Sequence, residues 1–290
     1  MQEAKSVKNV QIANNQLSVI TVIIAVFNGE KYLQQCIDSV ANQTYVDRQI
    51  IVVDGGSYDN TLKIIKLNQE KLSYWVSELD KGIYDAWNKG LKQASGDWIC
   101  FIGADDYLMD PGVLKKLSYQ LSLVPENIKI AYGQIMIIDA AGSALYALGE
   151  SWGSLKKRFQ QLMCLPHPAV MHRRSLFATH GMFDESFRIA GDYELLLREL
   201  KEGEAQFLPD IVVTAMRQGG ISSNPANNLI ALQEVRCAQT KNGVSTLKVH
   251  WLLALGRAYL GIILFKLFGV SFTRRLLNRV RSAMISAKLK

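Results

Sequence analysis

Apolar runs and helical periodicities alternate along the first hundred residues. Residues 17–27 (LSVITVIIAVF) form a continuous apolar run rich in β-branched side chains, which predicts a strand buried on both faces. A helical spacing of apolar residues follows over 30–43, and residues 49–53 (QIIVV) repeat the buried-strand pattern. The alternation continues with two helices and two strands, over 60–71, 72–76, 83–94 and 97–102. This order predicts a parallel sheet with helices on both faces.

The second half of the chain is less regular. A helix is predicted over 111–124, a strand region over 128–138, an amphipathic helix over 191–202 and a strand over 207–216. Residues 151–183 are mixed in pattern and indicate no single element. We expect an α/β domain over residues 17–225, preceded by a polar lead-in over 1–16 and followed by a C-terminal region over 226–290.

Composition narrows the class of protein. Of 290 residues, 49% are hydrophobic and 20% are charged, so the chain can build a core and global disorder is excluded. The net charge of +7 is uneven, because no acidic residue follows Glu234 whereas eleven basic residues do. This split argues against a nucleic-acid binder and leaves the basic tail to be explained. Four cysteines without a CxxC pair indicate a reducing, cytoplasmic setting.

Carboxylates follow two of the predicted buried strands. Asp54 comes directly after the strand over 49–53, and Asp105 and Asp106 follow the strand over 97–102. Open sheets of parallel strands bind ligands beyond the carboxyl ends of the strands, so these side chains are candidates for a site. Adjacent carboxylates suit a divalent cation, Mn²⁺ or Mg²⁺, that also holds a diphosphate. The alternative is turn chemistry, since aspartate is favoured in loops for its own backbone hydrogen bonds.

Five motifs in a fixed order connect these residues. They are IIAVFN at 23–28, IIVVDGGSYD at 50–59, SELDKGIYDAWNKG at 77–90, GDWICFIGADD at 96–106 and IAGDYELLLR at 189–198. The set resembles family 2 glycosyltransferases with the GT-A fold, of the bacterial polysaccharide-assembly type. The resemblance implies an α/β fold with a Rossmann-like, mostly parallel sheet flanked by helices, and a nucleotide-sugar substrate.

The resemblance also implies roles for residues at the ends of the strands. Ala25, Phe27 and Asn28 are expected near the base of the nucleotide, where Phe27 offers an aromatic face for stacking. The alternative for Phe27 is to cap the core. Asp54 is expected to accept a hydrogen bond from the base, and Asp105 to lie near the ribose.

Four more residues match functional positions of the resembling proteins. Asp106 matches the metal-binding residue of a DxD-type motif, and Asp80 and Lys89 match positions near the nucleotide. Asp192 matches the catalytic base. At the start of the helix predicted over 191–202, the helix dipole is expected to favour its ionised form. The alternative for Asp192 is a helix N-cap.

Three positions depart from the resembling proteins. Many of those proteins carry Pro where this chain has Ala25, a second Asp where it has Gly55, and Glu where it has Gly191. The first two changes leave the groups of the mechanism in place. The third removes a supporting carboxylate next to the expected base.

Two further segments carry reactive side chains. His167, His172 and Cys164 lack the spacing of a zinc site, and His167 matches a His-containing segment on the acceptor side of the resembling proteins. Arg217 and Ser222 flank a pair of glycines, and their side chains suit a diphosphate. An ordinary turn is the alternative for this loop.

The C-terminal region combines apolar and basic residues. Residues 249–270 are strongly apolar but include Arg257, which at the centre of a bilayer would cost at least about 2.5–3.5 kcal/mol. Residues 274–290 interleave cations with apolar side chains, a composition typical of a helix lying on an anionic membrane surface. We expect peripheral attachment to the inner face of the cell membrane, with a packed helical appendage as the alternative.

These features together predict an inverting glycosyltransferase of surface polysaccharide biosynthesis. It would move one sugar from a nucleotide-diphosphate donor, UDP-type favoured, to a saccharide acceptor linked to a lipid such as polyprenyl diphosphate. Residues 233–236 (QEVR) lack the Trp that completes the QxxRW motif of processive relatives, which favours single addition. The alternatives are a nucleotidyltransferase, whose glycine-rich phosphate loop is missing here, and a catalytically inactive membrane-binding module.

Overall fold

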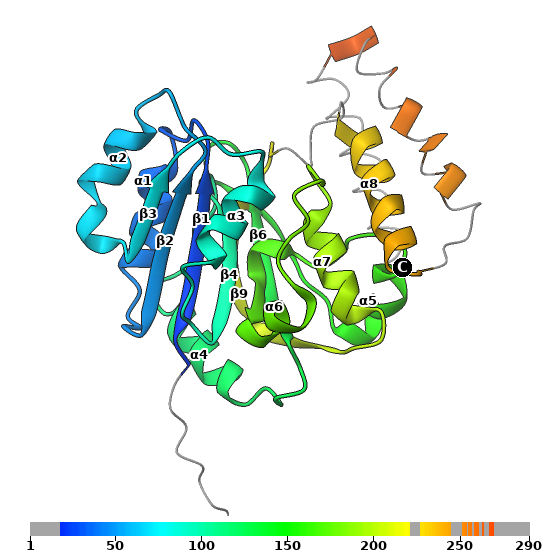
Figure 1. Ribbon diagram of the computed structural model, residues 1–290, viewed down its shortest axis with the longest axis horizontal. Coiled ribbons are helices and arrows are strands. Elements are labelled where there is room, and N and C mark those ends of the chain that lie inside the picture. The colour runs from blue at the N-terminus through cyan, green and yellow to red at the C-terminus, as the bar shows by residue number, and fades with distance from the viewer. Residues whose placement is uncertain are drawn as a thin grey trace, which may run out of the picture.

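A nine-stranded mixed sheet forms the centre of the part of the chain that the structure describes (Figure 1). The structure is a computed structural model. It describes residues 18–220 and 227–244, together with positions 251–253, 255, 256, 258–260, 263 and 267–269. In order across the sheet, the strands are β3 (Tyr74–Ser77), β2 (Arg48–Asp54), β1 (Ile20–Val26), β4 (Trp98–Gly103), β8 (Val170–Arg173), β6 (Ile130–Ile138), β9 (Ala205–Arg217) and β5 (Tyr107–Leu108). Strand β7 (Ala144–Leu148) pairs with the C-terminal part of β6.

The N-terminal half of the sheet is parallel, as the sequence predicts. Its strands are β1 (Ile20–Val26), β2 (Arg48–Asp54), β3 (Tyr74–Ser77) and β4 (Trp98–Gly103). The segments between them contain α1 (Leu33–Ala41), α2 (Thr61–Leu67), the short 3₁₀ helix η1 (Gln69–Lys71) and α3 (Ile83–Leu91). Every residue of β1 is buried, which explains its continuous apolar run.

The C-terminal half makes the sheet mixed. Its elements are β5 (Tyr107–Leu108), α4 (Val113–Ser122), β6 (Ile130–Ile138), β7 (Ala144–Leu148), α5 (Trp152–Phe159), the 3₁₀ helix η2 (His167–Ala169), β8 (Val170–Arg173), α6 (Arg174–His180), α7 (Gly191–Leu200), β9 (Ala205–Arg217) and α8 (Asn228–Lys241). Strand β8 lies antiparallel between β4 and β6, whereas β9 runs parallel to β6. The stretch over 151–183 that indicates no single element thus contains two helices and an inner strand.

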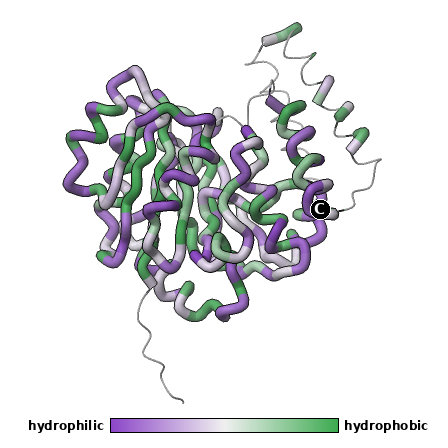
Figure 2. Tube along the Cα trace, in the orientation of Figure 1, coloured by the Kyte–Doolittle hydropathy of each residue, from purple (hydrophilic) through white to green (hydrophobic). Residues whose placement is uncertain are grey.

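Helices cover both faces of the sheet. On one face α1 and α4 pack against alternate side chains of β1 such as Val22 and Ile24. On the other face α3, α5, α6 and α7 pack against Ile23 and its neighbours. Figure 2 shows the apolar residues concentrated along the central strands, with polar residues on much of the surrounding loops and helices. The α/β architecture expected from the sequence is confirmed.

The C-terminal helix α8 packs beside α7 (Figure 1). Gln239 of α8 is buried, and its amide donates hydrogen bonds to the carbonyls of Gln160 and Gln161. Among the described residues, no helix has the length and apolar content needed to cross a bilayer. The basic stretch over 274–290 lies outside the described residues, and so does part of the apolar stretch over 249–270.

Candidate functional site

The carboxyl ends of the parallel strands bring the first group of predicted residues to one edge of the sheet. In register, Ala25 of β1 lies between Val53 of β2 and Gly103 of β4, and Asp54 ends β2 opposite Val26. Ala25 is buried in this arrangement. The loop that carries Asp105 follows Gly103 directly, so it begins at the same edge.

Phe27 is an exposed aromatic residue at this edge. Its side chain is 59% exposed, so the alternative that it caps the core is wrong. Tyr58, which is 83% exposed, lies beside it, with the two ring centroids 6.0 Å apart and the rings nearly perpendicular. Tyr58 is not among the residues predicted from the sequence to be functional. Its position in the loop that follows a predicted buried strand is the sequence feature that could have identified it.

Asn28 joins the loops that follow β1 and β2. Its backbone N–H donates to the hydroxyl of Ser57 at 2.7 Å, and its side-chain oxygen accepts the N–H of Tyr58 at 3.1 Å. Asn28 adopts a positive φ of 50°, a conformation that asparagine tolerates better than most residues. Its side chain therefore shapes the loop that carries Tyr58.

Asp54 is fully buried and hydrogen-bonded within the protein. Its carboxylate accepts the backbone N–H and the hydroxyl of Ser57, and the hydroxyl of Ser77 at the end of β3 at 2.6 Å. These bonds connect the ends of two neighbouring strands. Asp54 thus has a structural role at the edge, whatever contact it also makes with a ligand.

Asp80 fills the space that Gly55 leaves open. A Cβ atom placed on Gly55 would overlap the Oδ2 atom of Asp80. The other oxygen, Oδ1, accepts the N–H of Gly82 at 2.9 Å. Burial raises the pKa of the Asp80 carboxyl, and the nearby carboxylates of Asp85 and Asp54 add to this effect. A carboxylate from the loop before α3 thus occupies the place where resembling proteins carry an aspartate at position 55.

Lys89 anchors the loop that carries Asp80. Its ammonium group donates to the carbonyl of Leu79 at 2.9 Å and pairs with Glu78 at 3.0 Å and Asp85 at 3.6 Å. Its side chain is only 18% exposed. The charge of Lys89 is therefore engaged within the protein, and the residue holds the loop that carries Asp80.

Asp105 and Asp106 form the candidate cation site. Asp106 is 7% exposed, and its Oδ1 accepts the backbone N–H of Arg217 at 3.1 Å. Burial, followed by the charge of Asp105, raises the pKa of the Asp106 carboxyl to about 8. The described residues contain no group of three or more His, Cys, Asp or Glu side chains arranged around one metal position. Because Mg²⁺ takes one or two carboxylates plus phosphate oxygens, this pair fits a divalent cation that would compensate the buried charge.

Arg217 supports the loop that carries this pair. Its guanidinium group lies over the ring of Tyr32, 4.2 Å from the ring centroid. Its hydrogen bonds reach the carbonyls of Asp105, Asp139 and Ala140 and the side chain of Gln35. With these donors engaged inside the protein, Arg217 holds the loop in place. Ser222 lies outside the described residues.

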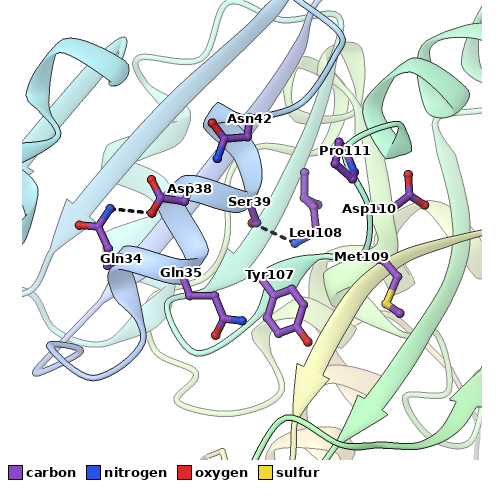
Figure 3. A pocket seen from close by; sticks show the side chains of 10 residues that line it. All are labelled: Gln34, Gln35, Asp38, Ser39, Asn42, Tyr107, Leu108, Met109, Asp110 and Pro111. Carbon is purple, nitrogen blue, oxygen red and sulfur yellow. Dashed lines mark hydrogen bonds between the residues drawn. The ribbon is translucent and has the colours of Figure 1, made fainter.

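A groove of about 600 Å³ lies between α1 and the segment that follows Asp106 (Figure 3). Its lining residues are Gln34, Gln35, Asp38, Ser39, Asn42, Tyr107, Leu108, Met109, Asp110 and Pro111. Gln35 is also the residue that accepts a hydrogen bond from Arg217. None of the residues predicted to be functional lines this groove, so it does not form part of the candidate site.

Asp192 lies in the first turn of α7. The helix begins at Gly191 and its N-cap is Ala190, so the alternative that Asp192 is the N-cap is wrong. The Oδ1 atom accepts the N–H of Tyr193 at 2.8 Å and the hydroxyl of Tyr84 at 3.3 Å. Burial raises the pKa of the Asp192 carboxyl to about 6, which outweighs the expected effect of the helix dipole. The side chain is nevertheless partly exposed to solvent.

The ring of Tyr84 occupies the space beside Gly191. A Cβ atom on Gly191 would lie 2.8–2.9 Å from three carbons of this ring, which is 2% exposed. Tyr84 is in the first turn of α3, four residues after Asp80. Because α3 begins just beyond the carboxyl end of β3, this contact places Asp192 at the same edge as the strand-end residues.

Glu234 acts on Asp192 through its charge, although in the sequence it stands out only as part of the QEVR segment. Its carboxylate accepts hydrogen bonds from the backbone of residues 188–190, directly before α7. Its negative charge also contributes to the raised pKa of Asp192. The two residues are 42 positions apart in the sequence, and no local pattern relates them.

His167 is buried in an aromatic cluster beneath α3. Its ring stacks on Trp87 with centroids 4.9 Å apart, and the ring of His172 lies 5.3 Å away. Burial lowers the pKa of His167 to about 3, so it is neutral at physiological pH. His167 is 7% exposed, so its side chain belongs to the buried aromatic cluster more than to an open acceptor surface.

Comparisons with known proteins agree on one family. The sequence model described as "Glycosyl transferase family 2" matches residues 21–175, just over half of the chain. A PGL/p-HBAD biosynthesis glycosyltransferase of Mycobacterium tuberculosis is 29% identical over 210 residues, which cover 71% of this chain and 79% of that protein. An uncharacterized glycosyltransferase of the same organism is 33% identical over 183 residues, covering 62% of this chain and 68% of that protein.

Solved structures share the fold. S. aureus TarS in complex with UDP superimposes with a TM-score of 0.61 at 20% identity, covering 86% of this chain and 72% of that one. A complex of the same protein with UDP-GlcNAc gives a TM-score of 0.59 at 19% identity, covering 86% and 73%. The mannosyltransferase PcManGT from Pyrobaculum calidifontis, in complex with GDP-Man and Mn²⁺, gives 0.60 at 16% identity, covering 92% and 81%. The likeness establishes a GT-A-like fold for this chain.

Proposed function

This chain belongs to glycosyl transferase family 2, and we propose that it is an inverting, non-processive enzyme that transfers one sugar from a nucleotide-diphosphate donor to a lipid-linked saccharide. The observation that carries this proposal is the position of Asp192. Asp192, a partly exposed residue, lies at the sheet edge that also carries Asp105 and Asp106, so the proposed base and the proposed diphosphate site share one face.

The donor nucleotide is proposed to bind across the ends of β1 and β2. Phe27 and Tyr58 offer exposed aromatic surface there, and stacking of a base on an aromatic ring contributes about 1–3 kcal/mol. Asp54 is fully buried and already accepts bonds from Ser57 and Ser77, so its proposed hydrogen bond to the base requires one of these serine side chains to move. Asp105 is proposed to contact the ribose. A UDP-type donor is favoured because TarS binds UDP and UDP-GlcNAc.

Asp106, with Asp105 beside it, is proposed to hold a divalent cation. The cation would supply charge stabilisation for the leaving diphosphate. The raised pKa of Asp106 supports this assignment, because the site is short of positive charge. The presence of Mn²⁺ in the PcManGT complex also supports it. Arg217 contributes by holding the loop through its backbone N–H and its guanidinium group.

Asp192 is proposed to remove the proton from the acceptor hydroxyl. A pKa of about 6 leaves its carboxyl mostly ionised at neutral pH while keeping it basic enough to accept a proton. Direct attack by the acceptor oxygen, on the side of the sugar opposite the leaving diphosphate, inverts the configuration at the anomeric carbon. The hydroxyl of Tyr84 orients the carboxylate through its bond to Oδ1.

The acceptor is proposed to be presented at a membrane surface. The eleven basic residues after Glu234, interleaved with apolar ones, suit an anionic surface on the inner face of the cell membrane. The function of the M. tuberculosis relative in PGL/p-HBAD biosynthesis supports a lipid-linked acceptor. Single addition is proposed because QEVR lacks the Trp of the processive motif.

The test is a panel of nucleotide sugars that includes UDP-GlcNAc and GDP-mannose, each with Mn²⁺. Binding is measured as a thermal shift, and turnover as release of nucleoside diphosphate with and without a polyprenyl-diphosphate-linked saccharide. The anomeric configuration of the product, read by NMR, tests inversion. Pyrophosphate release from UTP and a sugar 1-phosphate would instead indicate the nucleotidyltransferase. Absence of any donor turnover would indicate the inactive module.

A further inference from the structure

The turn immediately before α7 is held by a side chain from a distant helix. Oε1 of Glu234 accepts the backbone N–H of Arg188 at 2.8 Å. Oε2 accepts the N–H groups of Ile189 at 2.8 Å and Ala190 at 2.9 Å. Three consecutive N–H groups thus converge on one carboxylate, an arrangement known as an anion-binding nest. The next two residues along the chain are Gly191 and Asp192.

No local side chain performs this task. The N-cap of α7, Ala190, has no side chain able to cap the helix, and no side-chain cap bond is present at this helix. The carboxylate of Asp192 is directed to the N–H of Tyr193 and the hydroxyl of Tyr84. The conformation of the 188–190 turn, and with it the approach of Asp192 to Tyr84, therefore depends on Glu234.

Glu234 can hold this turn firmly because α8 is itself anchored. Besides its two carbonyl acceptors, Gln239 contacts the hydroxyl of Tyr193, and Lys241 forms an ion pair with Asp184. Both contacts lie one to two turns further along α8 from Glu234. The carboxylate is thus presented from a helix fixed against α7.

We propose that Glu234 is a positioning residue for the catalytic base, because its carboxylate fixes the 188–190 turn that leads directly into Asp192. This inference rests on the proposed role of Asp192. Many of the resembling proteins carry Glu at position 191, directly before the base. Here Gly191 leaves that position to the ring of Tyr84, and the carboxylate comes from α8 instead.

The charge of Glu234 should affect the pH dependence of the rate, which a purely structural contact would not do. The hydroxyl of Tyr84 from α3 and the N–H of Tyr193 bond to the carboxyl of Asp192, and Glu234 from α8 acts on it through its charge. The negative charge of Glu234 raises the pKa of Asp192, and the two hydrogen bonds lower it. Neutralising Glu234 should therefore move the acidic limb of the rate profile to lower pH. A contact that only stabilised the fold would not do this.

The experiment compares Glu234→Gln and Glu234→Ala in the full-length protein. Gln has the same shape but one acceptor oxygen, so it cannot satisfy all three N–H groups. Hydrogen exchange of the peptide covering 188–190 is measured without any ligand and should become faster in both variants. Turnover of UDP-GlcNAc with Mn²⁺, or of GDP-mannose if the panel selects it, should fall by about 10²-fold in Glu234→Ala. The KM for the donor should change by less than about threefold, because the donor edge is untouched.

Two further variants separate the possible outcomes. Lys129→Ala removes an ion pair with Glu199 near the C-terminal end of α7, and it should lower the melting temperature while leaving exchange at 188–190 and the acidic limb unchanged. Asp192→Asn should lower turnover by about 10²–10⁴-fold. If Asp192→Asn stays active, the proposed base is wrong. If Asp192→Asn is inactive while Glu234→Gln keeps the wild-type kcat and acidic limb, the positioning role of Glu234 is overturned and the base assignment stands.

Discussion

Replacing Asp192 by Asn should make the protein inactive and more stable. Burial, helped by the charge of Glu234, raises the pKa of the Asp192 carboxyl from 3.8 to about 6, so the fold disfavours the ionised form. A shift of about two units corresponds to about 3 kcal/mol, which we reduce to about 1–2 kcal/mol because the side chain is partly exposed. Asn removes the charge, while its oxygen still accepts the bonds from Tyr193 and Tyr84.

The pH dependence of this stabilisation is specific. The pKa of Asp192 is higher in the folded than in the unfolded protein, so the wild type loses stability as the pH rises from about 4 to about 6. The variant has no such loss. The difference in melting temperature should be near zero at pH 4 and constant above pH 6, at about 2–4 °C per kcal/mol. Circular dichroism melts from pH 4 to 8 measure it.

Activity should change in the opposite direction. Loss of a positioned base lowers the transfer rate by about 10²–10⁴-fold, and the wild-type rate should fall as the pH drops below about 6. Asp184→Asn is the matched control. Burial raises the pKa of Asp184, but Lys241 and Ser186 lower it to about 2 overall, so this variant should be destabilised at pH 7. The reasoning fails if Asp192→Asn transfers sugar at the wild-type rate or melts below the wild type at pH 7.

Three other changes test other parts of the site. Asp106→Ala should abolish the dependence of donor binding on Mn²⁺, measured by calorimetry; wild-type affinity that survives both this change and EDTA would contradict the cation site. Deleting residues 246–290 should release the protein from anionic vesicles in a sedimentation assay without lowering its melting temperature, and a truncated protein that still co-sediments would refute the tail's role. Gly191→Ala should cost about 1–3 kcal/mol in denaturant unfolding and slow transfer, because its Cβ overpacks against the buried ring of Tyr84; an unchanged midpoint would show that the ring can move.

Buried strands were the most predictable part of the fold. The segments that form β1 and β2 are apolar on both faces, and in a globular domain few structures other than a buried strand accommodate such a short apolar run. Their parallel pairing then placed Asp54 and Asp105 at one edge from sequence alone. By contrast, β7 is exposed along its whole length, and β8 is a four-residue strand between a 3₁₀ helix and α6. Neither has the alternation or length that identifies a strand.

The chemistry of the site was less predictable than its location. The sequence placed Asp192 at the start of a helix, but the sign of its pKa shift depends on burial by residues far away in the chain. The ion pairs of Lys89 and the internal hydrogen bonds of Arg217 likewise follow from tertiary contacts. Glu234 was not identified because its three acceptor bonds join segments more than forty residues apart.

The two glycines of the site each accommodate a side chain from the same five-residue segment, 80–84. Asp80 takes the room at Gly55, and Tyr84 takes the room at Gly191. Each glycine and its occupant therefore form a unit for protein engineering. Grafting Asp onto position 55 would force two carboxylates together unless Asp80 were replaced as well, and Glu at position 191 would require a smaller residue at position 84. Exchanging these positions between such enzymes therefore requires the segment and both glycines to be replaced together, and single replacements are expected to lower stability or activity.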